Sequence, residues 1–264
     1  MKDKKKLLFM GRKQVAADCL EWLFKLGESM DSPMFEIVGV LTDDHLPVSP
    51  TKDVAIRNNI KIYNFDSAMS AMKEGALDYD IGVSMLYWRK LKDLFLSVPK
   101  LGNINFHPAP LPDYKGTAGY NVAILEGLKQ WAATAHYVDE NIDTGEIIKV
   151  SKFDFNPYKD TAQTLEKATQ PILFNLFRDV LCAALTQDTK LKTIKNQGGR
   201  YISRKEMESM KEIKEGDDIS RKIRAFWFPP YDGAYIKIND KKYTLIDDFI
   251  LKELAAPSQK YTIF

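Results

Sequence analysis

The chain has 264 residues, of which 45% are hydrophobic and 28% charged, and this composition fits one large globular domain with a smaller appendage. Its 38 basic residues nearly balance its 36 acidic ones, and the net charge of +2 favours neither a nucleic-acid nor a membrane partner. The apolar runs are too short to cross a bilayer, and the basic start at residues 1–6 lacks the apolar stretch of a secretory signal. We therefore expect a cytoplasmic protein.

The first hundred residues alternate between short apolar runs and amphipathic stretches. Runs of strand length occur at residues 6–10, 35–41, 60–63, 81–85 and 102–106. Helical stretches separate them at residues 15–26, 53–58, 67–73 and 91–96. This alternation is typical of βαβ units and predicts an α/β fold with a doubly wound, mostly parallel sheet.

The character of the chain changes near residue 198. Before it, strand-like residues 132–138 and 146–150 precede a long helical stretch at 161–185. After it come two charged helical segments, at 203–211 and 217–226, and two alternating strands around Asn239 and Asp240. We predict a main domain at residues 1–197 and a small C-terminal α+β module at 198–264 with helices and a β-hairpin.

Ligands of doubly wound sheets bind beyond the carboxyl ends of the strands. The turn after the first strand has one glycine, Gly11, where a dinucleotide fingerprint needs three, so the sequence gives little support for NAD binding. A plain turn into a helix explains it better. Arg12 and Lys13 in this turn are still candidates for binding a substrate phosphate.

The cysteines and two of the three histidines carry no chemistry in this interpretation. Cys19 and Cys182 lack the neighbours of a zinc site or a redox pair, so we expect both to be buried apolar residues and we expect no metal. His45 lies in a polar loop and His136 in a strand. We expect these two histidines to be solvated or structural.

The strongest candidate site follows the fifth strand-like run. Polar and apolar residues alternate there, so Asn105 and His107 face the same side of a strand. Three prolines, the first directly after His107, then end the regular structure. We expect them to leave both polar side chains exposed at the edge of the sheet.

These residue types suit attack on a carbonyl group. The histidine can accept a proton near neutral pH, and the amide can donate to an oxygen that becomes negative. Asp143, in a turn after another strand-like region, supplies a carboxylate to orient the imidazole. No serine or cysteine is placed as a nucleophile, which favours direct attack by a substrate amine. On spacing alone, a structural histidine remains an equal alternative.

Residues 102–116 and 139–145 resemble the core of the N10-formyltetrahydrofolate-dependent formyltransferases in both spacing and identity. Residues 80–88 extend the resemblance, and they match the strand and loop that line the folate pocket in that family. The resemblance implies a Rossmann-like formyltransferase fold with N10-formyltetrahydrofolate as co-substrate. It departs at Ala109 and Pro110, where many relatives have a serine and a leucine.

The resemblance also assigns roles to individual residues. It implies that Asn105 donates to the tetrahedral oxyanion, that His107 manages the amine proton, and that Asp143 orients and charge-balances His107. It further implies folate contacts at Met85, Leu86, Tyr87 and Ile142.

The tail bears on the formyl acceptor. Residues 224–235 resemble the Phe-Pro-Pro-aromatic segment of sugar-nucleotide N-formyltransferases, which act on amino sugars destined for bacterial surface polysaccharides such as the O-antigen of lipopolysaccharide. The acceptor implied is a dTDP-linked 3- or 4-amino dideoxy sugar. Trp227 and Tyr231 are then candidates for stacking on the base. Alternatively, they only cover a module whose core contains Phe226 and Phe228.

Two other activities stay open. In the first, the formyl acceptor is initiator tRNA or glycinamide ribonucleotide, although a short tail that is not basic argues against tRNA. In the second, the chain is a non-catalytic folate- or nucleotide-binding protein on the same scaffold. The last two strands also suit a homodimer contact through the C-terminal module. The apolar residues that would form it are Ile236, Ile238, Tyr243 and Leu245.

Overall fold

The computed structural model describes residues 4–31, 33–42 and 49–255, which form two compact units. The first unit comprises Met1–Gly116, Ala132–Phe153 and Ala168–Tyr201. The second comprises Thr117–Trp131, Asp154–Lys167 and Ile202–Phe264. The second unit therefore combines the tail with two segments from earlier in the chain. The boundary between residues 197 and 198, as the start of a separate module, stays a prediction.

A seven-stranded sheet forms the centre of the first unit, in the order β3-β2-β1-β4-β5-β7-β8. Its strands are β1 (Lys5–Gly11), β2 (Phe35–Leu41), β3 (Ile62–Tyr63), β4 (Ile81–Met85), β5 (Asn103–His107), β7 (Gln130–Tyr137) and β8 (Ile147–Asp154). The pairs from β3 through β5 are parallel, whereas β5 and β7 are antiparallel. The predicted α/β fold with a mostly parallel sheet is confirmed.

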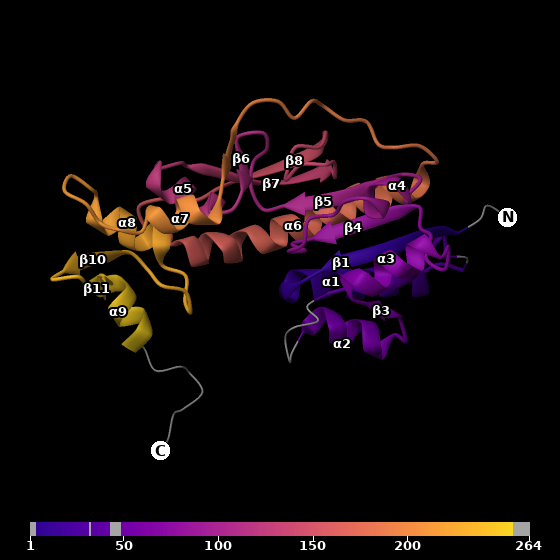
Figure 1. Cartoon of the computed structure of the whole chain (residues 1–264), viewed down its shortest axis with the longest axis horizontal. Coiled ribbons are helices and arrows are strands. Elements are labelled where there is room, and N and C mark those ends of the chain that lie inside the picture. The colour runs from indigo at the N-terminus through magenta and orange to yellow at the C-terminus, as the bar shows by residue number, and fades with distance from the viewer. Residues whose placement is uncertain (1–3, 32, 43–48, 256–264) are drawn as a thin grey trace, which may run out of the picture. The chain divides into compact units, whose positions relative to one another are not determined.

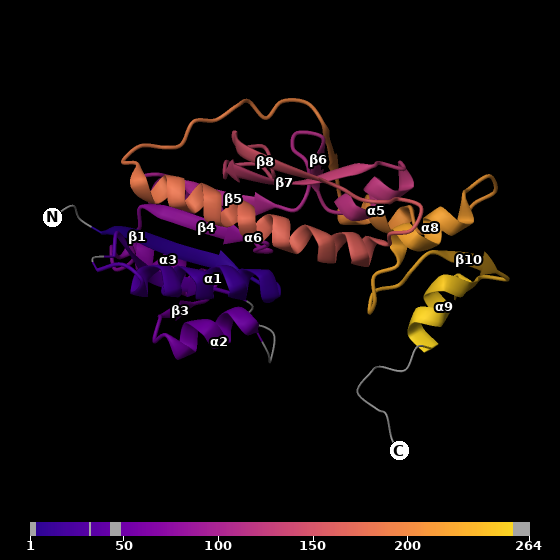
Figure 2. The same ribbon diagram turned by 180° about the vertical axis from the view of Figure 1, so that it is seen from behind.

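Helices cover both faces of this sheet. They are α1 (Lys13–Glu28), α2 (Pro50–Arg57), α3 (Phe65–Lys73), α4 (Leu94–Ser97) and α6 (Ala162–Thr186). Along β1, Leu7 and Phe9 pack with α1 and α6, and the alternate residues Leu8 and Met10 pack with α3 and α4. Figure 1 shows α3 in front of the sheet, and Figure 2, from behind, shows α6 crossing the other face.

The packing of β5 determines which way its polar residues point. The Phe106 ring packs edge-on against Phe177 of α6 with ring centroids 5.4 Å apart, and Phe177 also contacts Phe9 and Trp22. Side chains alternate along a strand, so burying Phe106 on the α6 face turns its two neighbours to the opposite face. Those neighbours are Asn105 and His107.

The second unit has its own small apolar core. Its elements are α5 (Gly119–Leu125), α7 (Arg204–Ser209), α8 (Ile219–Phe226), β10 (Tyr235–Ile238), β11 (Lys241–Thr244) and α9 (Asp248–Ala255). Ile124 of α5, Phe226 of α8 and Ile250 of α9 are buried together. Strands β10 and β11 pair antiparallel around Asn239 and Asp240, which matches the predicted hairpin. A further two-stranded sheet joins β6 (Tyr114–Gly116) to β9 (Arg200–Ile202).

Several smaller expectations can be checked against the structure. Cys19 is buried as expected, but the prediction for Cys182 is wrong, because Cys182 lies on the solvent side of α6 while its neighbour Leu181 is in the core. His45 lies outside the described residues. Within the described part of the chain, no helix combines the length and apolar character needed to cross a bilayer.

Candidate active site

Asn105 and His107 lie on one face of β5, next to the antiparallel strand β7. Asn105 is half-buried and pairs in register with His136, whereas His107 is only 6% exposed. The expectation that the prolines would leave His107 exposed is wrong. The loop after β5 instead folds back over the strand end, so that the carbonyl of Tyr114 lies 2.8 Å from His107 Nε2.

Thr134 of β7 holds the start of that loop. Its hydroxyl donates to the carbonyl of Ala109 at 2.7 Å and accepts from the amide of Leu111 at 3.1 Å. The Thr134 side chain has no exposed surface. The course of the chain beyond His107 is therefore fixed by buried hydrogen bonds, which are costly to break.

Asp143 reaches the two strands by an indirect route. Because β7 is antiparallel to β5, it ends with Tyr137 opposite Ile104, away from His107. The loop that follows brings Asp143 back, so that its Oδ2 lies 3.4 Å from His107 Nδ1 and accepts from the Gly116 amide at 2.8 Å. The turn at residues 143–145 that brings Asp143 back is tight. Asp143 has φ +56°, and a Cβ on Gly145 would lie 1.8 Å from the Tyr137 carbonyl oxygen, so residue 145 must be glycine.

The hydrogen bonds of His107 define its reactive nitrogen. The Tyr114 carbonyl can only accept, so Nε2 carries a proton and donates it. In the neutral ring Nδ1 is then the nitrogen that can take a second proton. Since Nδ1 lies beside the Asp143 carboxylate, the cation formed there would be charge-balanced.

Burial and charge set the protonation states of this pair. Burial lowers the pKa of His107 from its ordinary value of 6.5, and the Asp143 carboxylate raises it only in part. For Asp143, burial acts to raise the pKa, but the positive charge that His107 carries when protonated, the nearby His136 ring and the hydrogen bond from the Gly116 amide outweigh it and lower the pKa to about 2. Near pH 7 the site therefore holds a neutral imidazole beside an ionised carboxylate.

His136 is the residue that the sequence did not reveal. Its Nδ1 donates to the carbonyl of Tyr137 at 2.7 Å, which leaves Nε2 as an acceptor in the neutral ring. That nitrogen lies 3.0 Å from Asn105 Nδ2 and 3.5 Å from Asp143 Oδ1. His136 was expected to be solvated or structural, and its burial agrees with a structural role, but its contacts join two candidate catalytic residues.

Both ends of the Asn105 amide are held in place. Its Oδ1 accepts from the Ser84 hydroxyl on β4 at 2.8 Å, and one of its N–H groups donates to His136. The amide has a second N–H group. A fixed amide donor next to a neutral imidazole and a carboxylate can stabilise a developing oxyanion while a proton is taken from an attacking nucleophile.

The four predicted folate contacts differ in their accessibility. Met85 is fully buried and its carbonyl accepts from the Arg12 amide at 3.2 Å, so its side chain offers no surface to a ligand. Leu86 and Tyr87 after β4 are half-buried, and Leu86 has φ +54°. Ile142, beside Asp143, is 43% exposed although it is apolar.

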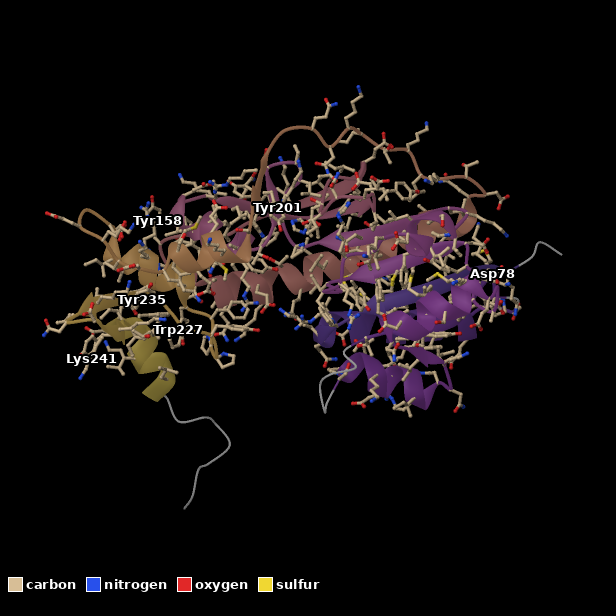
Figure 3. The ribbon with its side chains drawn as sticks, viewed as in Figure 1. Asp78, Tyr158, Tyr201, Trp227, Tyr235 and Lys241 are labelled. Carbon is tan, nitrogen blue, oxygen red and sulfur yellow. The ribbon has the colours of Figure 1, made fainter. Side chains whose placement is uncertain are left out.

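The predicted substrate contacts lie in both units. In the first unit, at the carboxyl end of β1, Arg12 is the N-cap residue of α1 and Lys13 its first residue, which is exposed. Trp227, labelled in Figure 3, directly follows α8 in the second unit, where it is half-buried. Tyr231 is 57% exposed. Phe226 is in the core of this unit, and Phe228 packs against that core.

Comparisons with known sequences show which family of proteins the chain resembles. Residues 47–181, just over half of the chain, match the model of a family described as formyl transferase. A methionyl-tRNA formyltransferase from Clostridioides difficile (strain 630) is 34% identical over 154 residues, covering 54% of this chain and 48% of the relative. The chain spans about half the length of such curated relatives.

Solved structures show a similar fold. A 4-N formyltransferase from Francisella tularensis superposes with a TM-score of 0.72 at 20% identity, covering 91% of this chain and 96% of that one. An N-formyltransferase from Helicobacter canadensis, in complex with folinic acid and dTDP-3-aminofucose, superposes with a TM-score of 0.69 at 24% identity, covering 90% of this chain and 86% of that one. At these identities the likeness concerns the fold.

The electrostatics of the His107–Asp143 pair can be tested by NMR. The His107 side chain, assigned by the loss of its signals in His107→Gln, should titrate with a midpoint below 6.5. Asp143→Asn should lower the midpoint further, because it removes the charge that favours the imidazolium. A wild-type midpoint above 6.5, or an upward shift in the variant, would contradict the proposed protonation states.

Proposed function

Because the chain belongs to the formyl transferase family, we propose that it transfers a formyl group from N10-formyltetrahydrofolate to the amino group of a nucleotide-linked dideoxy amino sugar. The observation that carries this proposal is the convergence of the half-buried Asn105 with the buried His107 and Asp143 in one network of polar contacts. An amide donor, a neutral base and a carboxylate are the groups that amine attack on a formyl carbon requires.

In the proposed mechanism the neutral amine of the acceptor attacks the formyl carbon and forms the new C–N bond. The free N–H of Asn105 donates to the oxygen that becomes negative. His107 accepts the amine proton at Nδ1, where the Asp143 carboxylate balances the charge. The bond between the formyl carbon and N10 then breaks, and His107 returns the proton to the departing nitrogen.

The surface near the catalytic residues supports the choice of donor. Half-buried Leu86 and Tyr87 follow β4, next to β5, and exposed Ile142 adjoins Asp143. Accessible apolar side chains close to a few polar groups are what a flat heterocycle such as the pterin of a folate requires. Of the four predicted folate contacts, Met85 would support the pocket from the protein interior, since its side chain is buried.

A dTDP-sugar is the acceptor that we favour. The Helicobacter canadensis enzyme, whose fold is similar, was solved with dTDP-3-aminofucose. Trp227 and Tyr231 are proposed to contact the base, and Arg12 and Lys13 the diphosphate. The enzyme would then act in the cytoplasm, on sugars destined for surface polysaccharides.

The second candidate acceptor is initiator tRNA. It is favoured by the sequence relatives named methionyl-tRNA formyltransferase. Against it stands the net charge of +2, because proteins that hold tRNA need basic surface to contact phosphates.

One assay distinguishes these acceptors. The protein is incubated with N10-formyltetrahydrofolate and a panel of dTDP- and GDP-linked 3- and 4-amino sugars, charged initiator tRNA and glycinamide ribonucleotide, and products are read by mass spectrometry. We expect a formyl group on a dTDP-amino sugar. Formylation of tRNA alone would replace the proposed acceptor, and binding without any product would indicate a non-catalytic protein.

The three catalytic assignments are tested by substitution. His107→Gln should lower kcat by roughly 10²–10⁴-fold, and Asn105→Ala by roughly 10²–10³-fold, because they remove the base and the oxyanion donor. Asp143→Asn should be similarly impaired. The matched control is Asn141→Ala, which removes an exposed amide from the same loop as Asp143 and should leave kcat unchanged. Near wild-type turnover by His107→Gln would refute the mechanism.

We also propose that the chain forms a homodimer through the hairpin β10–β11. Ile236 pairs directly with Tyr243, and Ile238 lies on the same face. Ile238 is 51% exposed and Tyr243 47% exposed, so this face presents apolar surface, although the exposed Lys241 pairs with Ile238 on it. Leu245, the fourth predicted contact residue, packs against the core of the second unit instead. The other face is polar, because Lys237 and Lys242 lie over the ring of Tyr235.

The dimer predicts a mass of twice 30.2 kDa in sedimentation equilibrium. Ile238→Asp should shift the protein toward the monomer, because a charge at the contact would be buried without a partner. Thr244→Asp places the same charge on the opposite face of the hairpin and should leave the mass unchanged. A wild-type protein that stays monomeric at micromolar concentration would exclude this contact.

A further inference from the structure

The segment after α6 lies against the loops that frame the candidate active site. Residues 193–200, here called the strap, belong to the orange trace between α6 and α7 in Figure 1. Near one end, Ile194 exchanges two backbone hydrogen bonds with Ile147 of β8, at 2.8 and 2.9 Å. At the other end, the amide of Arg200 donates to the carbonyl of Asp113 at 3.1 Å. The strap therefore connects β8 with the loop after β5.

Between these ends, Asn196 binds the turn that carries Asp143. Its Nδ2 donates to the carbonyl oxygens of Asp143 and Gly145, at 3.0 and 2.8 Å. Both hydrogens of the amide are thereby used. The orientation of the amide is unambiguous, because a reversed side chain would place its oxygen against two carbonyl oxygens.

The glycines that follow let the strap lie directly on the loop after β5. The Gly198 carbonyl accepts from Lys115 Nζ at 2.6 Å. A Cβ on Gly199 would lie 1.7 Å from the carbonyl oxygen of Pro112, so only glycine fits there. This loop supplies the partners of the catalytic pair, which are the Tyr114 carbonyl and the Gly116 amide.

The turn at Asp143 needs such support because its backbone is in the left-handed region, which residues other than glycine seldom adopt. On one side Gly145 packs against the carbonyl of Tyr137. On the other side Asn196 supplies donors for two carbonyls. Relaxation of this turn would move the carboxylate away from His107, which it now approaches to 3.4 Å.

We propose that Asn196 is a positioning residue, whose side chain binds the carbonyls on both sides of Thr144 and so holds the Asp143 carboxylate beside His107. This inference rests on the proposed catalytic roles of Asp143 and His107. Asn196 acts through Asp143, and substrate binding does not depend on it.

The experiment compares wild type with Asn196→Leu, which keeps the branched arrangement of side-chain heavy atoms and removes both donors. If the carboxylate moves away, the NMR midpoint of His107 should fall toward the value measured in Asp143→Asn. With the acceptor identified by the panel, kcat should fall roughly 10–100-fold while KM for both substrates changes little. Asn196→Gln, which keeps an amide, should recover part of the loss.

The control is Lys195→Ala, which changes an exposed neighbour on the strap and should leave the His107 midpoint and kcat unchanged. Circular dichroism establishes that each variant is folded. If Asn196→Leu does not fold, Asn196→Ser is used in its place, because it also removes the amide and the same downward shift is expected. An unchanged His107 midpoint in a folded variant overturns the inference.

A double-substitution cycle separates this inference from the proposed function. If Asn196 acts through Asp143, adding Asn196→Leu to the Asp143→Asn variant should lower kcat little further. Full additivity of the two losses would overturn the positioning role. Wild-type activity in Asp143→Asn alone would refute the catalytic assignment, whereas an inactive Asp143→Asn with a fully active Asn196→Leu would refute only the positioning role.

Discussion

The buried carboxylate of Asp143 is the group on which the arrangement of the site depends. An ionised carboxylate in a dry environment is tolerated only where donors and positive charge compensate its lost hydration. Here the Gly116 amide donates to it, a proton taken up at His107 Nδ1 would place positive charge 3.4 Å from it, and the His136 ring packs beside it. These partners come from three segments of the chain. The requirement to satisfy one charge therefore explains why the loop after β5, the strand β7 and the returning turn must all meet at one point.

Much of the fold follows from local sequence. The apolar runs give β2 and β4 with the predicted limits, and the alternation around Phe106 explains why Asn105 and His107 share a face. The short elements β6, α5, β9 and α9 were not predicted, because strands of three residues and helices of seven or eight residues are too short to show a clear periodic pattern. Their pairing depends on segments distant in sequence, as in the match of residues 114–116 with 200–202.

The site was predictable in its residues but less so in its environment. Three prolines indicated a rigid exit from the sheet, and an exposed histidine seemed the natural result. The burial of His107 arises instead from Thr134 and Tyr114, whose hydrogen bonds fold the exit back over the strand. The role of His136 depends on the antiparallel register that sets it opposite Asn105. No local pattern around residue 136 encodes that register, since it is a property of two strands together.

The second unit is built from three separated stretches of sequence, and this limits how such a protein can change. Ile124 comes from a segment that precedes β7 of the main sheet, and Ala162 begins α6 after β8, the last strand of that sheet in the chain. Both share a core with Phe226 and Ile250 of the tail. A tail acquired by recombination would arrive without these partners and would have to match apolar surface that was already present. Diversification of this unit is therefore expected to proceed by gradual, coordinated substitution in all three stretches, and only rarely by the exchange of a gene's 3′ end.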